Sequence, residues 1–280
     1  MSRNLNTDHV KIAGAAVIWG SSGAFIKYLG LPPGVIAFFR VGIPVMVLGI
    51  YLTVKREKLF QNGVKIILMA SVVNAIRLLF YFIGYLNAPI GNAIIILYTW
   101  PVFAVIFSHF FLREPLPCLN QILLLMAMGG IVMVFSDKNI RLDNSVVLGM
   151  GAMLVSAALN AATVVLFKHE SLKFTAPQIV FFQNFAGALI FLPFFLYGID
   201  ELTLQKTSVA SGYGFLIGVV GYGLFFYALR QVRASTASFL SYLEVLSGVL
   251  FGVFLFHESL AWNEIAGGTM IILSSVLLRK

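Results

Sequence analysis

The chain has 280 residues, of which 60% are hydrophobic and 11% are charged, and its formal net charge at pH 7 is +8. A water-soluble domain of this size needs far more polar surface, so the composition excludes a soluble protein and indicates one dissolved mainly in lipid. The lysines and arginines fall singly between apolar runs, which argues against nucleic acid as a partner. The single cysteine excludes an internal disulfide, and we expect neither a metal site nor a cofactor.

Ten apolar runs follow one another along the chain. A membrane-spanning helix needs about 20 apolar residues, so these runs predict an all-α integral membrane protein with ten transmembrane helices. The runs lie at 10–28, 34–54, 64–86, 90–111, 118–136, 146–167, 176–197, 208–229, 235–256 and 260–278. The connections between them are short, which predicts a compact bundle in the lipid bilayer. A cleaved signal peptide is not expected, because the N-terminal segment is polar and more spans follow the first run.

The distribution of basic residues predicts how the bundle is oriented. With the N-terminus in the cytoplasm, thirteen lysines and arginines fall in inside segments and three in outside loops. Cytoplasmic loops of membrane proteins carry the excess of positive charge, so we expect both termini in the cytoplasm. The remaining three cations, Lys27, Arg40 and Arg77, lie within spans.

The two halves of the chain resemble each other. The stretch "ILYTWPVFAVIFSHFFLREPL" at 96–116 aligns without a gap with "LSYLEVLSGVLFGVFLFHESL" at 240–260. Both stretches end in a similar turn, which contains Glu114 in the first half and Glu258 in the second. Each glutamate precedes a new span, where a carboxylate favours the helix N-terminus and can cap free N–H groups, so we interpret both as structural.

Each half contains five spans, and an odd number forces the second half to enter the membrane from the opposite side. We therefore predict two inverted five-helix repeats, over residues 1–140 and 141–280. Inverted repeats are typical of secondary transporters, whose substrate site lies near mid-bilayer where the repeats meet. We therefore expect the site residues to lie near the middle of the spans.

In the first two spans, Trp19 is a candidate aromatic wall of such a site. Ser21 and Ser22, beside Gly20 and Gly23, favour close helix packing instead. Arg40 lies ~9 Å from the outer end of its helix, so its side chain is expected to snorkel outward.

The third span contains the residue whose burial in the membrane costs the most free energy. Arg77 lies close to the membrane midplane, where a charged side chain needs a partner or a function. Asn74, Arg77 and Tyr81 follow i, i+3, i+7 spacing and share one face, which we expect to turn away from lipid.

The fourth and sixth spans add further candidates. Tyr98 and Trp100 lie mid-span, and Pro101 beside Trp100 frees a backbone carbonyl and bends the helix, which is tolerated where a helix lines a cavity. Asn160 and Thr163 in the sixth span would add polar contacts.

In the ninth span, Ser241, Glu244 and Gly248 form a second polar stripe near mid-depth, and Tyr242 is another candidate aromatic wall. Two interpretations of Arg77 and Glu244 stay open. They form a buried ion pair that locks the two halves together, or they line an aqueous cavity. In a cavity, Arg77 would take a substrate carboxylate and Glu244 an ammonium group or a coupling proton.

Over essentially its whole length the sequence resembles the drug/metabolite transporter superfamily, in its EamA-type branch of ten-span proteins. The stretches that carry the resemblance are "WGSSGAFIKY", "FFR", "FYFIGYLNAPIGNAIIILYTWPVFAVIFSHFFLREPL", "GGIVMV" and "SFLSYLEVLSGVLFGVFLFHESL". It implies that the third, fourth, eighth and ninth spans line a central cavity and that the halves rock in alternating access. The second half departs from the pattern at Glu244 and Val245, so the halves are not equivalent at the site.

Together these features predict a secondary transporter in the bacterial cytoplasmic membrane for small amphipathic metabolites, amino acids or their relatives first. Export is implied by the resemblance alone. The alternatives are efflux of cationic drugs or quaternary amines, bound by Glu244 and aromatic faces, and a lipid-headgroup flippase subunit. An enzyme is not expected, because the four histidines are scattered and every aspartate lies in a terminus or loop. The oligomeric state is not indicated.

Overall fold

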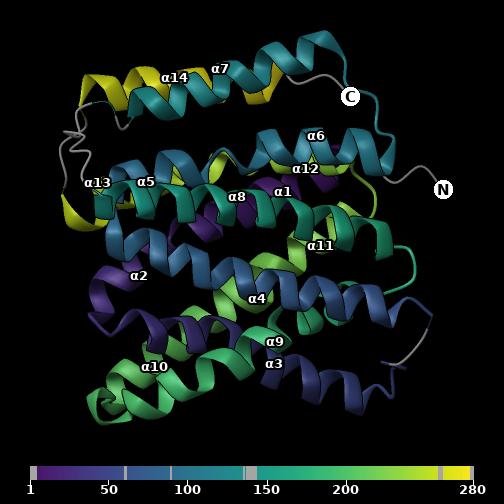
Figure 1. Cartoon of the computed structure of the whole chain (residues 1–280), viewed down its shortest axis with the longest axis vertical. Helices are drawn as coiled ribbons and strands as arrows, with labels where there is room; N and C mark the ends of the chain where they lie inside the picture. The colour runs from purple at the N-terminus through teal and green to yellow at the C-terminus, as the bar shows by residue number, and fades with distance from the viewer. Residues whose placement is uncertain are drawn as a thin grey trace.

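The computed structural model describes residues 5–59, 62–88, 90–134, 136, 144–257 and 261–277, and all regular elements in these ranges are helices (Figure 1). They are α1 (Leu5–Gly20), α2 (Ser22–Leu29), α3 (Pro33–Val54), α4 (Val64–Asn87), α5 (Ile90–Leu97), α6 (Trp100–Leu112), α7 (Cys118–Val134), α8 (Asn144–Glu170), α9 (Ala176–Tyr197), η1 (Ile199–Glu201), α10 (Leu204–Tyr213), η2 (Gly214–Gly221), α11 (Tyr222–Leu229), α12 (Ala234–Leu240), α13 (Leu243–Phe256) and α14 (Trp262–Leu277). The all-helical membrane architecture expected from the sequence is confirmed.

Eight helices of the described chain are long and apolar enough to cross a membrane. They coincide with the first four expected spans and with the sixth to the ninth. Shorter apolar helices, Cys118–Val134 and Ile265–Ser274, occupy the fifth and tenth positions. The count of ten spans therefore stays a prediction.

Four of the long spans change or lose their helical hydrogen-bonding pattern partway across. The first breaks between α1 and α2, the fourth between α5 and α6, and the ninth between α12 and α13, while the eighth passes through the π-helix η2. In the fourth span the cause is local, because Pro101 has no N–H to donate to the carbonyl of Leu97. Irregular backbone at membrane depth is tolerated where it is buried in protein or lines a cavity, so these breaks point to the functional centre.

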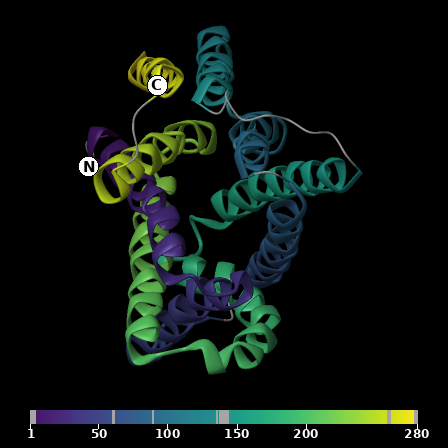
Figure 2. The same cartoon turned by 90° about the vertical axis from the view of Figure 1, so that its left-hand side faces the viewer.

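The helices of the two halves pack against each other in matching pairs. α3 packs on α9 and α7 on α14, and the contact of α6 with α8 is matched by that of α13 with α1. If every span is replaced by the corresponding span of the other half, the same pairs of helices remain in contact. Both views of the fold show α7 and α14 side by side along one edge of the bundle (Figures 1 and 2).

Two glycines allow α7 and α14 to approach closely. A Cβ atom on Gly130 would lie 2.6 Å from the carbonyl oxygen of Gly267, and one on Gly267 would collide with the carbonyl oxygen of Gly130. Small residues at a helix crossing let backbones meet in lipid, where no hydrophobic force drives the helices together. The edge pair is thus held by close backbone packing, away from the centre of the bundle.

Glu114 has a structural role, but on a different helix from the one expected. Its carboxylate accepts hydrogen bonds from the backbone N–H groups of Ala234 at 2.7 Å and Ser235 at 3.1 Å, and from the Ser235 hydroxyl at 2.6 Å. It therefore caps α12 in the other half of the chain rather than the span that follows it. This contact was not predictable from local patterns, because the two segments are 120 residues apart. Glu258, its counterpart, lies outside the described residues.

A lysine on α8 links the same end of the bundle to α11. The ammonium group of Lys168 donates to the carbonyl oxygens of Leu229 at 2.6 Å and Val232 at 2.9 Å, just where α11 ends. Cations are favoured at helix C-termini, where carbonyl groups lack partners. This contact and the Glu114 cap tie together segments that are far apart in sequence at the end of the bundle where Figure 1 marks both chain termini.

Candidate functional site

A cavity of about 100 Å³ lies among the interrupted spans. It is lined by Trp19, Ser22, Ile26, Arg40, Arg77, Tyr81, Leu97, Tyr98, Trp100, Asn160, Thr163, Val164, Gln183, Tyr222, Phe225, Phe226 and Glu244. These residues come from eight of the ten expected spans, whereas the resemblance implied four. Within the described chain α7 and α14 contribute no lining residue, in keeping with their place at the edge.

Seven of the ten sequence-predicted site residues line this cavity: Trp19, Arg77, Tyr81, Tyr98, Trp100, Asn160 and Glu244. They lie up to 225 residues apart in sequence and come from both halves of the chain. The other three, Asn74, Ser241 and Tyr242, are buried nearby but do not line it.

Arg77 is held in place by Asn74. The Arg77 Nε donates a hydrogen bond to Oδ1 of Asn74 at 2.9 Å, and Nδ2 of Asn74 donates to the carbonyl oxygen of Gln183 at 2.8 Å. Asn74 therefore positions the guanidinium. In the described structure this is the only hydrogen bond of the Arg77 side chain, so its two terminal nitrogens are free to bind an anion.

Arg40 also points into the cavity, and the prediction that it snorkels outward is wrong. A terminal nitrogen of Arg40 donates to the Tyr222 hydroxyl at 3.1 Å, and both residues line the cavity. The reason is the close approach of α3 to η2, where a Cβ atom on Gly218 would lie 2.7 Å from the carbonyl oxygen of Arg40. That approach places the guanidinium within reach of the bundle interior. The polar residue at the matching position of the other half, Gln183, was the available signal.

Glu244 faces the two arginines across the cavity. Its carboxylate is hydrogen-bonded by the Tyr98 side chain and is close enough to Arg40 and Arg77 for electrostatic attraction. No ion pair joins Glu244 to either arginine among the residues that the structure describes. The Arg77 and Glu244 side chains thus line the cavity without forming an ion pair in the described structure, and their role in binding stays a prediction.

Ser241 and Tyr242, at the break between α12 and α13, do not line the cavity. The Ser241 hydroxyl donates to the carbonyl oxygen of Ala237 at 3.0 Å, which satisfies it within its own helix. Tyr242 is completely buried, packs edge-on against Phe239, and contacts the sulfur of Met128 at 3.9 Å. The prediction for Ser241 assumed an unbroken helical stripe with Glu244, and the break before α13 interrupts that stripe.

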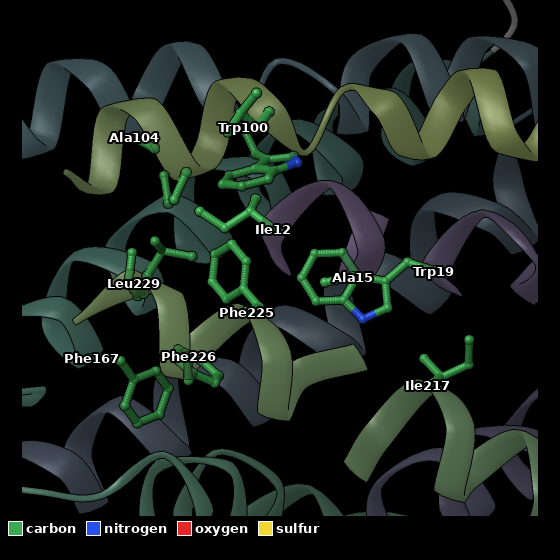
Figure 3. Packing of buried hydrophobic residues seen from close by; sticks show 14 of the residues in the cluster. Ile12, Ala15, Trp19, Trp100, Ala104, Phe167, Ile217, Phe225, Phe226 and Leu229 are labelled. Carbon is green, nitrogen blue, oxygen red and sulfur yellow. The ribbon is translucent and has the colours of Figure 1, made fainter. Parts of the chain in front are cut away.

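The aromatic wall of the cavity is larger than the sequence indicated. The Trp19 ring packs against Tyr222, with 4.8 Å between ring centroids, and against Phe225, with 5.2 Å. Figure 3 shows Trp19 and Phe225 facing each other in the packed interior, with Trp100 above them. Tyr222 and Phe225 were missed because aromatic residues are frequent throughout the chain, and only their place on α11 distinguishes them.

Several lining residues occupy matching positions in the two halves. Aligning "WGSSG" with "NAATV" places Trp19 opposite Asn160 and Ser22 opposite Thr163, and all four line the cavity. Ser22 was expected to serve helix packing only, and the match with Thr163 was the signal that it does more. The cavity thus lies where corresponding parts of the two halves meet.

Gly20 brings α1 next to the backbone of Glu244. A Cβ atom there would lie 2.7 Å from the carbonyl oxygen of Glu244 and would collide with the Ser247 hydroxyl, whereas one on Gly23 would meet no atom within 4 Å. Gly20 therefore serves close packing as expected, and Gly23 does not.

We expect Gly20→Ala to lower the free energy of unfolding by about 1–3 kcal/mol, the usual cost of overpacking. Gly23→Ala, the matched control, should be neutral or stabilising by up to about 1 kcal/mol, because alanine is the better helix former. Thermal unfolding of both variants in detergent provides the measurement. Equal melting temperatures would contradict the close approach of α1 and α13.

Comparisons with known proteins agree with this architecture. The model of the EamA-like transporter family matches the chain twice, over residues 9–136 and 147–280. The pseudopaline exporter CntI of Pseudomonas aeruginosa is 24% identical over 251 residues, covering 89% of this chain and 87% of the exporter. The transporter YoaV of Bacillus subtilis is 25% identical over 277 residues, covering 93% and 92%. A solved crystal structure superposes with a TM-score of 0.81 at 18% identity, covering 97% of this chain and 96% of that one.

Proposed function

Because the chain belongs to the EamA-like transporter family, we propose that it is a secondary transporter that exports small amphipathic metabolites, amino acids or related compounds first, across the bacterial cytoplasmic membrane. The observation that carries this proposal is the cavity at mid-span, which both halves line and which holds cationic, anionic and aromatic side chains. The guanidinium groups can bind a carboxylate of the substrate, and the carboxylate of Glu244 can bind an ammonium group. The aromatic rings can pack against an apolar part of the substrate.

Alternating access is the mechanism we propose, with two inverted repeats over residues 1–140 and 141–280. The matching helix contacts of the two halves support it, because such an arrangement lets one half rock against the other around a fixed central site. The double match of the family model, once in each half, also supports two repeats.

The direction of transport and the orientation rest on separate observations. The relative from Pseudomonas aeruginosa is named as an exporter, which favours export here. The excess of lysine and arginine in the segments on one side favours cytoplasmic termini. Together they support release of the substrate on the side of the membrane opposite the chain ends.

The size of the cavity favours a small substrate over a drug. Sites for drug-sized ligands usually occupy about 300–1,000 Å³, well above the 100 Å³ of this cavity. Quaternary amines would use Glu244 and the aromatic rings but leave both guanidiniums without a partner.

A binding screen followed by a flux measurement tests the proposed function. The purified full-length protein is screened by thermal shift against amino acids, carboxylates and quaternary amines, and the compounds that stabilise it are assayed for flux in proteoliposomes. We expect stabilisation and flux with compounds that carry both a carboxylate and an amine. Flux of amines without a carboxylate, and none of amino acids, would favour the alternative.

A further inference from the structure

The balance of charge in the cavity differs from that of an ordinary amino acid. Two guanidiniums, on Arg40 and Arg77, and one carboxylate, on Glu244, line the same space. A zwitterion with one carboxylate and one amine would satisfy Glu244 and only one of the arginines. A charge left without a partner at membrane depth is costly, so the ligand is expected to neutralise the second guanidinium as well.

Neither arginine is hydrogen-bonded to a carboxylate in the described part of the chain. There, the Arg40 side chain donates only to the neutral hydroxyl of Tyr222, and the Arg77 side chain only to the neutral amide of Asn74. Among the described residues, neither forms an ion pair with Glu244, and the two guanidiniums are near enough to repel each other. An anionic group between them would relieve that repulsion and use donors that are already oriented.

The charges are also divided between the two halves of the protein. Arg40 on α3 and Arg77 on α4 belong to the first half, and Glu244 on α13 to the second. When the two halves are aligned, Arg40 corresponds to Gln183 and Glu244 corresponds to Trp100. Each of these two charges is therefore present in one half only. A ligand that spans the cavity therefore directs its acidic groups toward the first half and its amine toward the second.

Building on the transport function proposed above, we propose that the substrate is an amino dicarboxylate, a compound with two carboxylates and one amine. One carboxylate binds Arg77, which Asn74 positions, and the other binds Arg40, which Tyr222 positions. The amine binds Glu244 beside Tyr98. The aromatic rings pack against the carbon chain that joins these groups.

Matched pairs of ligands test this proposal on the full-length protein by isothermal titration in detergent. The probes are aspartate against asparagine, glutamate against glutamine, and iminodiacetate against N-methylglycine. In each pair the first member has an additional carboxylate, and at least one such member should bind roughly tenfold more tightly than its partner, as expected for one charge-assisted contact.

Variants of Arg40 test whether its guanidinium causes the preference for the ligand with the additional carboxylate. Arg40→Gln should reduce the ratio of the two affinities to about one while leaving the weaker member of the pair bound, and Arg40→Lys should keep most of the preference. Lys27→Gln removes a cation that is exposed and lies outside the cavity, so it should leave the ratio unchanged.

The outcomes separate this proposal from the transport function. Equal affinities within every pair, or tighter binding of the singly acidic members, would overturn the amino dicarboxylate and leave an amino acid transporter in place. No binding of any member, with binding of quaternary amines, would overturn both. A preference that Arg40→Gln leaves intact would remove Arg40 from the site and overturn the proposed geometry.

Discussion

Replacing Arg77 by glutamine is expected to lower substrate affinity and flux by roughly 10- to 100-fold, the loss of a charge-assisted contact of about 1.5–3 kcal/mol. Its terminal nitrogens are the donors that the described structure leaves uncommitted, and Asn74 holds them in place through a 2.9 Å hydrogen bond to Nε. Folding should be retained, because glutamine removes a charge from the membrane interior instead of adding one.

Flux in proteoliposomes and binding by titration provide the measurement, and Arg56→Gln provides the control. Arg56 is exposed just beyond the end of α3 and lies outside the cavity, so its replacement removes the same charge without touching the site. Arg77→Lys should recover part of the activity, since the ammonium group keeps the charge but loses the paired geometry. If Arg77→Gln folds poorly and the folded fraction transports normally, Arg77 is a structural residue.

The second large effect is expected at Glu244. Glu244→Gln removes the only carboxylate that lines the cavity in the described structure, so the affinity for the amine of the substrate should fall by roughly 10- to 100-fold. The Tyr98 hydroxyl can still hydrogen-bond the amide, and glutamine has nearly the same shape, so the free energy of unfolding should change little.

A pair of flux measurements distinguishes the two roles that Glu244 could have. If it binds the amine, Glu244→Gln raises KM for amino substrates and the flux still responds to an imposed pH gradient. If it carries a coupling proton, flux driven by the gradient is lost while exchange of substrate across the membrane persists. Glu201→Gln, at an exposed glutamate in η1, is the control. A variant with unchanged KM and an unchanged response to the gradient would remove Glu244 from the site.

The resemblance to the EamA-type branch is confirmed by the family match, and the all-helical membrane architecture by the structure. The family was predictable from the stretches that resemble it. The architecture was predictable because the length of apolar runs is read along the chain, one span at a time. The mid-span position of Arg77 was predictable for the same reason. A charged side chain that lies nine or more residues from either end of an apolar helix cannot reach the membrane surface and must face the bundle interior.

The errors have a common physical origin in the crossing and breaking of helices. The Arg40 side chain was predicted to snorkel outward because it lies near the outer end of its helix. It lines the cavity instead, because Gly218 lets η2 approach α3 closely at this point. Ser241 was placed by an ideal helical period that the break before α13 interrupts.

The sequence by itself determined the class of the molecule and the helices that are long and apolar enough to cross lipid, and it predicted the correspondence between the two halves. These follow from the transfer of apolar residues into lipid, which depends on composition and order alone. Only the tertiary structure decided which polar groups share a cavity, because that depends on how closely helices from distant parts of the chain approach. It brought Arg40, Arg77 and Glu244 to one cavity, gave Asn74 a supporting role, and directed Glu114 to a helix 120 residues away.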